Sequence, residues 1–552
     1  MDPIVRPALA ALAAALLATP AAALAQRGPV SVSPDSLRAT VFAIAADSMG
    51  GRETGSPGDA ATAQWVAAAF ARAGLTPAGE NGTWFQTIGL WRVALDTTGG
   101  LVAGGVRLAP PRDVMPMFPS MSWDPKGATA LYGGVADDST TWPSAEQAAG
   151  RLLVMRPPAD TTWLALTHAM LMLRRNPRFG SVAGFAIAAL AHAPPSLVAQ
   201  MLAGRVIGDT LVFSLLRGSL LVTPSAAGVL LGVSLAAAVP GTTGPTLTGG
   251  VLFRRAALWN PARNVIAVLP GADSTLRHTY VSLTAHHDHI GFARPPLDHD
   301  STRAADRVLR PMGADSPPRQ PTPEEAARIA TLLDSLRRAH PPRLDSVYNG
   351  ADDDASGTAA VVELARVLAR GPRPRRSILF VSHAAEERGL LGSRWYTDHP
   401  TVPRDSIVAE LDMDMVGRGD ASDLPHGGPG YVELVGSRRL STEFGDLIES
   451  VSAREPVPFR FNYEYDAPNQ PLQYYCRADH FSYARYGIPS VSVSTGEHLD
   501  YHQVTDEAQY IDYAKLARVT ALVRDVALAV ANLDHRPAVN GPKPDPRAPC
   551  RQ

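Results

Sequence analysis

The chain has 552 residues, of which 45% are hydrophobic and 19% charged, and its formal net charge is -2 at pH 7. This composition is typical of a soluble globular protein, and the length predicts two or three domains. Because neither sign of charge dominates, nothing in the sequence favours a nucleic acid or an anionic membrane surface as a partner.

The first 25 residues have the features of a secretory signal peptide. One early basic residue, Arg6, precedes an apolar stretch that ends in Ala23-Leu24-Ala25, a small-x-small pattern typical of a cleavage site. We therefore expect residues 1–25 to be removed from an exported protein, periplasmic or extracellular, whose mature chain begins near Gln26. The alternative is an uncleaved membrane anchor, although Pro20 and the short apolar length are unfavourable for a membrane span.

Two segments precede the α/β part of the chain. Residues 26–90 are expected to form N-terminal helices of the same domain as residues 255–535, with a turn at Gly50-Gly51 and a helix that ends near Gly74. Residues 91–254 change to short β-rich runs with Pro and Gly turns, which indicates a separate module. Within that module, residues 219–241 are apolar enough to suggest a transmembrane helix, but their internal proline and glycine predict a buried strand followed by a helix.

Residues 255–535 alternate strand and helix patterns, which predicts an α/β fold with a mixed, mostly parallel sheet flanked by helices. A Pro- and charge-rich segment, about 293–346, interrupts the alternation, carries one amphipathic helix at 323–339 and is expected to be a surface insertion. The expected strands are 264–271, 279–288, 376–384, 407–417, 431–437 and 489–496, and the expected helices are 357–369, 390–398, 441–451 and 511–533.

The end of the chain, residues 536–552, is Pro-rich, and we expect it to be disordered. Cys476 and Cys550 are the two cysteines of the sequence, which are too few for a disulfide scaffold. A single bridge between them stays open, although the expected mobility of the tail is unfavourable to it.

Histidines and acidic residues gather at the ends of the predicted strands or in the turns that follow them. In α/β folds, sites form at these turns. The motifs are SLTAHHDHIG (282–291), NGADDDASG (349–357), SHAAEERGLLGS (382–393), LDMDMVGRG (411–419) and HLDYHQVTDE (498–507).

Histidine and carboxylate groups without cysteine suit a pair of borderline divalent cations, with Zn²⁺ as the default and Co²⁺ or Mn²⁺ as substitutes. Two metals about 3.5–4 Å apart need one bridging carboxylate, terminal ligands on each side and a bridging water. A further carboxylate must take the proton of that water. The adjacent Glu386 and Glu387 meet two of these needs, because one can coordinate while the other points at the water.

In this order, the five motifs resemble those of the M28 family of co-catalytic zinc aminopeptidases, over about residues 36–90 and 255–533. The resemblance implies the zinc-exopeptidase fold, two Zn²⁺ ions per chain, and peptides with a free N-terminus as substrates; the oligomeric state stays open. It also implies the ligands: His286 and Asp414 for one zinc, Glu387 and His502 for the other, and Asp353 as the bridge.

The resemblance also assigns residues that do not bind metal. Glu386 is the expected general base that activates the metal-bridging water, and Tyr501 is an expected donor to the oxyanion. Asp288 is expected to orient the first ligand histidine, and Asp479, in RADHFSYARYGIPSVSV, to bond a ligand histidine. In such families the peptide bond between the two residues at 353 and 354 is often cis.

The β-rich module is similar to the protease-associated (PA) domain that several M28 enzymes carry, a likeness that rests on LLVTPSAAGVLL and the stretch before it. Two departures from the family pattern stand out. The gap from His286 to Asp353 is long because of the insertion, which is suited to a lid that narrows the substrate range. His287 replaces a residue that is often a bulky aromatic or aliphatic one, which indicates a local packing change.

Other interpretations stay open for some residues and for the function. A same-fold glutaminyl cyclase with one zinc, a carboxypeptidase, or a receptor-like binding protein are the alternatives to an aminopeptidase. Asp412 is the rival of Asp414 as a ligand. Structural roles are the alternatives for His287, His289, His383 and His498 in packing or loop hydrogen bonds, and for Asp352 and Asp354 as helix caps.

Overall fold

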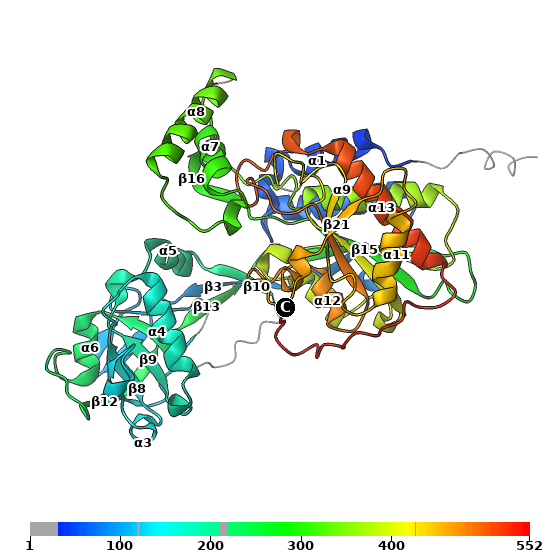
Figure 1. The fold of residues 1–552 in the computed structure, drawn as a ribbon. Helices are drawn as coiled ribbons and strands as arrows, with labels where there is room; N and C mark the ends of the chain where they lie inside the picture. The colour runs from blue at the N-terminus through cyan, green and yellow to red at the C-terminus, as the bar shows by residue number, and fades with distance from the viewer. Residues whose placement is uncertain (1–30, 119–121, 209–217, 340, 425–426) are drawn as a thin grey trace, which may run out of the picture. The chain divides into compact units, whose positions relative to one another are not determined.

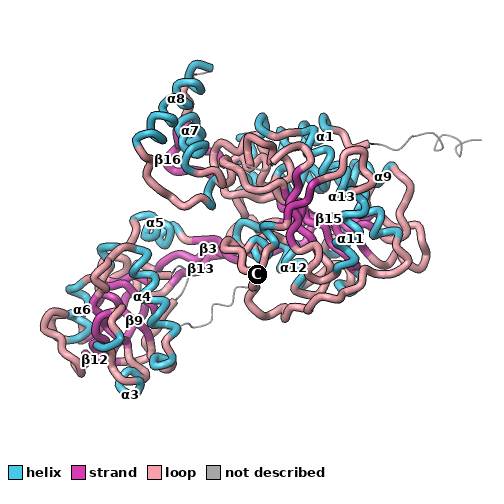
Figure 2. The backbone as a smooth tube through the Cα atoms, in the orientation of Figure 1, coloured by secondary structure: helices cyan, strands magenta, loops and turns pink. Residues whose placement is uncertain are grey.

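The computed structural model describes residues 31–118, 122–208, 218–339, 341–424 and 427–552, and the expected signal peptide lies outside them. The chain divides into two compact units, which are described separately (Figures 1 and 2). The first unit comprises Met1–Glu53, Pro57–Gln86 and Arg263–Gln552, and the second comprises Thr54–Ser56 and Thr87–Ala262.

A mixed sheet forms the centre of the first unit. In the described residues it has nine strands in the spatial order β1-β14-β18-β15-β19-β22-β20-β21, with β2 paired to β14. The central pairs β18/β15, β15/β19 and β19/β22 are parallel, whereas β14/β18 and β20/β22 are antiparallel, which confirms the expected mixed sheet. The strands are β1 Thr76–Pro77, β2 Phe85–Ile88, β14 Ala262–Leu269, β15 Tyr280–His286, β18 Ser377–His383, β19 Ile407–Met413, β20 Tyr431–Val435, β21 Arg460–Asn462 and β22 Ser490–Ser494.

Helices cover both faces of this sheet, as predicted. One face packs against α1 Pro34–Ile44, α2 Pro57–Ala73, α9 Ala355–Arg370, α11 Thr442–Ser452 and α13 Tyr513–Asn532, and the other against α10 Leu391–Asp398 and α12 His480–Ala484. Short 3-10 turns join them: η1 Asp47–Arg52, η2 Glu80–Gly82, η7 Glu386–Arg388, η8 Arg404–Ser406, η9 Glu464–Asp466, η10 Tyr474–Cys476 and η11 Ala508–Tyr510.

Strand β18 shows why the sequence folds in this way. All seven of its residues are buried, and it lacks polar alternation because this central strand, parallel to β15 and antiparallel to β14, is covered on both faces. Successive side chains point to opposite faces, so Phe380 packs on Phe70 of α2, with ring centroids 5.9 Å apart, whereas Val381 lies in the cluster of Tyr396 and Tyr483. Several residues of the site come directly after strands that, like β18, are packed on both faces.

The predicted insertion lies between β15 and α9 and has its own structure. It contains β16 Phe292–Asp298, α7 His299–Leu309, η6 Gly313–Asp315, α8 Pro323–Ala339 and β17 Leu344–Val347. Strands β16 and β17 pair antiparallel, and α7 contacts α8. The sequence predicted α8 with its bounds, but the hairpin-like pair and α7 were missed.

The second unit has a mostly β architecture with helices packed on it. Its larger sheet has the order β5-β4-β12-β7-β8-β9-β11-β6, and its smaller sheet the order β10-β3-β13. The strands are β3 Leu90–Leu95, β4 Gly100–Ala103, β5 Val106–Leu108, β6 Val114–Pro116, β7 Thr129–Val135, β8 Leu152–Arg156, β9 Gly184–Ile187, β10 Arg205–Gly208, β11 Gly218–Val222, β12 Thr243–Gly250 and β13 Phe253–Ala257. The helices are α3 Ala145–Ala148, α4 Trp163–Arg175, α5 Pro195–Ala203 and α6 Pro224–Leu231, with the turns η3 Ser139–Thr141, η4 Pro177–Phe179 and η5 Leu190–His192.

The apolar stretch 219–241 is a buried strand and helix, as predicted, because β11 is followed by α6. Thr223 caps α6 by accepting a hydrogen bond from the N–H of Ala226, Pro224 opens the helix, and Gly232 ends it in the left-handed region. Within the described part of the chain, no helix combines the length and apolarity that a membrane span requires. The unit extends beyond the predicted bounds 91–254, since β3 begins at Leu90 and β13 ends at Ala257.

Residues 536–552, for which the sequence predicted disorder, contain no helix or strand. Cys550 is bonded to Cys476 by a disulfide, so the bridge that stayed open from sequence is present. Beyond it, Gln552 accepts a hydrogen bond from the N–H of Tyr475 at 2.9 Å and donates to the carbonyl of Ala467 at 3.2 Å. The tail is therefore attached beside η10, a contact between distant segments that local composition does not reveal.

Candidate metal centre

All five predicted ligands meet at the carboxyl edge of the parallel strands. His286 ends β15, Asp414 directly follows β19, and Glu387 lies in η7, after β18. Asp353 precedes α9, and His502 lies in the loop that follows β22. Because parallel strands end at the same edge of a sheet, residues more than 200 positions apart come within reach of one another.

These five residues form two groups that share one carboxylate. In the first group, His286 Nε2 lies 3.2 Å from Asp353 Oδ1 and 3.7 Å from Asp414 Oδ1. In the second, His502 Nε2 lies 2.9 Å from Asp353 Oδ2 and 3.1 Å from Glu387 Oε1. Asp353 therefore presents one oxygen to each group, which is the arrangement expected of a bridging carboxylate.

His289 belongs to the second group, although the sequence favoured turn packing for it. Its Nδ1 lies 2.8 Å from Glu387 Oε1 and 3.7 Å from Asp353 Oδ2, and its side chain is fully buried. The four residues His289, Asp353, Glu387 and His502 each offer a ligand atom within 4.8 Å of the others. The signal in the sequence was the third histidine of the AHHDHIG motif, which follows the first ligand by three residues.

The chemistry of this donor set fits divalent zinc. Imidazole nitrogens and carboxylate oxygens, without a thiolate, are its usual ligands outside cysteine-rich structural sites. Burial, together with the carboxylates of Asp353 and Glu387, raises the pKa of Asp414. Burial opposes protonation of His502, but the adjacent Glu387 and Asp353 raise the pKa of His502 well above its ordinary value. Buried carboxylates at this spacing require positive charge between them, which divalent cations supply.

Glu386 lies next to the ligands without belonging to either group. Its Oε2 is 4.0 Å from His286 Nε2, and its side chain is 12% exposed. Burial raises the pKa of Glu386 well above that of an ordinary glutamate, and the neighbouring Glu387 adds to the effect. Ala385, with φ of 60°, turns the chain in the left-handed region so that the two adjacent glutamates follow the strand end directly. A carboxyl group in this position is suited to accept and return a proton.

Asp288 lies where the sequence predicted it. Its Oδ1 is 3.7 Å from His286 Nδ1 and accepts a hydrogen bond of 3.0 Å from the N–H of Glu386. Asp479 does not make the expected bond: among the described residues, no hydrogen bond joins it to a ligand histidine. It is buried instead, and burial raises the pKa of Asp479 to about 7. Against this effect of burial, the charge of His286 lowers the pKa of the Asp479 carboxyl group, so the role expected of Asp479 stays a prediction.

Tyr501 also lies in the site, where it is hydrogen-bonded to Arg477, a residue that the sequence did not point to. Arg477 Nη2 donates to the Tyr501 hydroxyl at 3.0 Å, and the Tyr501 ring stacks on His502 with centroids 4.1 Å apart. The inserted segment supports the same turn, because the N–H of Ala314 donates to the Tyr501 carbonyl at 3.0 Å. Arg477 precedes the predicted Asp479 by two residues, so only its position in that motif could have drawn attention to it.

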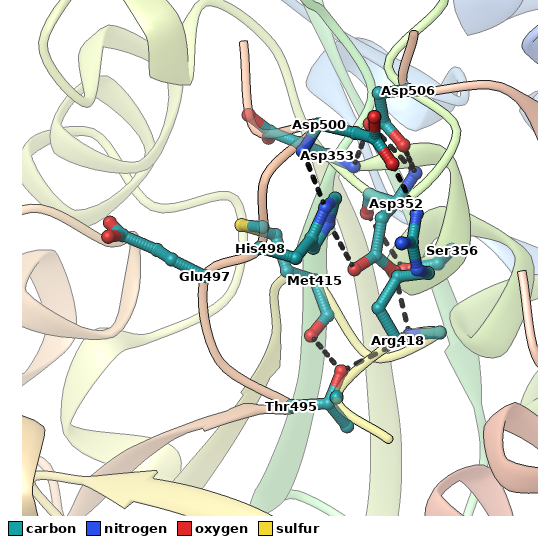
Figure 3. A network of polar contacts seen from close by, with 12 residues as sticks. Asp352, Asp353, Ser356, Met415, Arg418, Thr495, Glu497, His498, Asp500 and Asp506 are labelled. Atoms are coloured by element: carbon teal, nitrogen blue, oxygen red, sulfur yellow. Dashed lines mark hydrogen bonds and ion pairs between the residues drawn. The ribbon is translucent and has the colours of Figure 1, made fainter. Parts of the chain in front are cut away.

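The rival residues have structural partners of their own (Figure 3). His498 Nε2 lies 3.1 Å from Asp352 Oδ2, and Asp506 accepts hydrogen bonds from the N–H groups of Asp352 and Asp353. This network fixes the backbone from which the Asp353 carboxylate projects. Asp412 accepts a hydrogen bond from the Thr284 hydroxyl at 2.9 Å and belongs to neither ligand group.

Asp354, His287 and His383 also have hydrogen-bond partners outside the two ligand groups. Asp354 caps α9 by accepting a hydrogen bond from the N–H of Gly357 at 2.9 Å, and the peptide bond between residues 353 and 354 is cis, as the resemblance implied. His287 Nδ1 lies 2.8 Å from the Ser382 hydroxyl, and His383 Nε2 lies 3.1 Å from the Tyr483 hydroxyl.

Arg52 is a further residue that sequence reasoning missed. It is fully buried, and its guanidinium donates to the carbonyls of His287 at 2.8 Å, Asn349 at 2.6 Å and Gly350 at 2.8 Å. Those carbonyls belong to the segments that carry two of the ligands. Arg52 thus joins the first two motifs, and the only signal for it was the glycine turn that precedes it.

Residues 264–527 match the model of peptidase family M28. Leupeptin-inactivating enzyme 1 of Streptomyces exfoliatus is 30% identical over 170 residues, which cover 30% of this chain and 34% of the relative. A probable aminopeptidase of Saccharomyces cerevisiae is 28% identical over 245 residues, which cover 43% and 60% of the two chains. The matches thus span less than two thirds of these relatives. Among solved structures, an aminopeptidase from Aneurinibacillus sp. strain AM-1 has a TM-score of 0.46 at 16% identity, covering 93% of this chain and 97% of that one.

Proposed function

We propose that the protein, whose residues 264–527 match the model of peptidase family M28, is an aminopeptidase that holds two Zn²⁺ ions and removes N-terminal residues from peptides. One observation carries the proposal: Asp353 directs its two carboxylate oxygens at two separate groups of ligands. A site for a single metal ion would need only one of the two ligand groups, and Asp353 would then not have to reach both of them.

The ligands divide between the two ions as follows. His286 and Asp414 would hold one ion, Glu387 and His502 the other, and Asp353 both, with His289 close enough to contribute to the second. When bound, the two ions supply Lewis acidity, which polarises the scissile carbonyl and makes water more acidic.

The residues around the ions complete the reaction. Glu386 accepts a proton from the attacking water as the new carbon–oxygen bond forms, and it returns the proton to the amine as the carbon–nitrogen bond breaks. Tyr501 is placed to donate its hydroxyl proton to the oxyanion, because the hydroxyl oxygen already accepts from Arg477. The carboxylates on the cavity wall favour a protonated substrate amine, which is consistent with a requirement for a free N-terminus.

We assign the protein to the periplasm or the extracellular space. The signal-like residues 1–25 support export, and the Cys476–Cys550 disulfide is typical of an oxidising compartment. The second unit is proposed to be of the PA type, on the basis of its β-rich composition and the LLVTPSAAGVLL stretch.

The test is metal analysis of the purified chain combined with hydrolysis of aminoacyl p-nitroanilides. Two zinc ions per chain, activity that a chelator abolishes, and recovery with Zn²⁺ would support the proposal. Release of C-terminal residues, cyclisation of N-terminal glutamine, or metal binding without any turnover would instead favour a carboxypeptidase, a glutaminyl cyclase or a binding protein.

A further inference from the structure

The cavity at the candidate metal centre has a second wall that the proposed chemistry does not use. Besides ligands, the cavity is lined by Tyr465, Tyr474, Arg477 and Glu497. Figure 3 shows the Glu497 side chain directed away from the neighbouring His498 network. An ionisable group that faces a substrate cavity, and that lies outside the reacting set, bears on which substrates enter.

Glu497 is a buried carboxyl group with few partners. It is 4% exposed, and its Oε2 accepts a hydrogen bond of 2.7 Å from the Tyr474 hydroxyl. The nearest cationic group is Arg477, whose Nη1 is 3.8 Å from Glu497 Oε1. Burial raises the pKa of Glu497 to about 8, and the nearby carboxyl group of Asp315 also contributes.

Arg477 does not neutralise this wall by itself. Its Nη1 forms an ion pair with Asp315 of the inserted segment, and its Nη2 donates to the Tyr501 hydroxyl at 3.0 Å. The wall residues Arg477 and Glu497, together with Asp315 behind Arg477, therefore comprise two carboxyl groups and one guanidinium. When both carboxyl groups are ionised, one negative charge remains, because Glu497 shares the single guanidinium of Arg477 with Asp315, which lies closer to it.

We propose that Glu497 selects peptides whose N-terminal residue is lysine or arginine, by pairing with the cationic end of that side chain. This inference rests on the proposed aminopeptidase function. Tyr465 and Tyr474 complete the pocket, because their rings stack at 3.9 Å with an interplanar angle of 6° and offer apolar surface for the methylene stem. An apolar N-terminal residue would cover the Glu497 carboxyl group without offering it a counter-charge, which is unfavourable when the acid is ionised.

The proposal can be tested with two substrates that differ in charge alone. Norleucine has the stem of lysine without the ammonium group, so the ratio of kcat/KM for lysyl- and norleucyl-p-nitroanilide measures recognition of the charge. We expect wild-type protein to favour the lysyl substrate by about tenfold or more. Glu497→Gln should lower this ratio by about tenfold or more, through the KM of the lysyl substrate, and leave norleucyl hydrolysis within about twofold.

Glu433→Gln is the matched control. Glu433 is also buried, is bonded to a tyrosine hydroxyl (Tyr431) and has a pKa raised to about 7 by burial, but it does not line the cavity. The control should keep the wild-type ratio. A wild-type comparison of lysyl and Nε-acetyl-lysyl substrates needs no variant and should show the same preference for the charged form.

The outcomes are distinct. Equal kcat/KM for lysyl and norleucyl substrates in wild-type protein would overturn the proposal and leave the aminopeptidase function intact. An equal loss for both substrates in Glu497→Gln would also overturn it, because Glu497 would then support the pocket or the substrate α-amine. Absence of hydrolysis of every aminoacyl substrate by the zinc-loaded protein would contradict the proposed function itself.

Discussion

Replacing Arg52 by lysine should destabilise the protein by about 2–4 kcal/mol. The guanidinium lies within 3.1 Å of four carbonyl oxygens, those of Ile44, His287, Asn349 and Gly350. A lysine ammonium has three donors at a single point, whereas the planar guanidinium spreads its five donors. In Arg52→Lys at least one buried carbonyl therefore loses its hydrogen-bond donor, and the hydrogen bonds to the others become poorly aligned. Each buried carbonyl left without a donor costs about 1–3 kcal/mol of stability.

The assay is urea unfolding of metal-free and zinc-loaded protein, followed by circular dichroism. Since two of the affected segments carry His286 and Asp353, the apparent zinc affinity of Arg52→Lys should fall together with the free energy of unfolding. Arg438→Lys is the control, because Arg438 is 35% exposed and forms surface ion pairs with Asp446 and Glu449. Such pairs contribute about 0–1 kcal/mol. A loss below 1 kcal/mol for Arg52→Lys, with an unchanged m-value, would refute the reasoning.

Three further changes have defined outcomes. Glu386→Gln should lower kcat by about 10²–10⁴ and keep zinc bound, as steady-state kinetics and metal analysis can show; loss of metal would reassign Glu386 to the ligands. Cys550→Ser should lower the free energy of unfolding by about 2–5 kcal/mol, because the bridge to Cys476 closes a loop of 74 residues; equal urea midpoints for the variant and the oxidised wild type would contradict this. Burial opposes ionisation of Asp423, but hydrogen bonds and charge from Arg418 lower the pKa of Asp423 to about 2. The stability that ionised Asp423 contributes to the folded protein is therefore present above about pH 4 and is lost as the pH falls toward 2. Asp423→Asn should therefore reduce the difference in stability between pH 5 and pH 2, and an unchanged difference would argue against the ion pair.

The predictions that succeeded rest on signals that are local in the sequence. Strand β18 is a continuous apolar run, α8 has a clear amphipathic period, and each ligand motif directly follows a strand. Because parallel strands end at the same edge of the sheet, the motifs that follow them are expected to lie close together, and no tertiary contact has to be known to predict this. This is why the sequence could predict that His286, Asp353 and Asp414 lie close together.

The failures concern contacts between segments that no local pattern encodes. Arg477 reaches Tyr501 because η10 lies beside the last ligand loop, and Gln552 binds near η10 because the chain returns to that point. His289 was assigned to packing because strand alternation says nothing about a turn that bends back toward Glu387.

The most direct test of the two-metal account is crystallography of the zinc-loaded protein with anomalous data at the zinc absorption edge. The account predicts two anomalous peaks, one beside His286 and Asp414 and one beside Glu387 and His502, each with an Asp353 oxygen at about 2.0–2.2 Å. A single peak, or two peaks with Asp353 bound to only one of them, would contradict it.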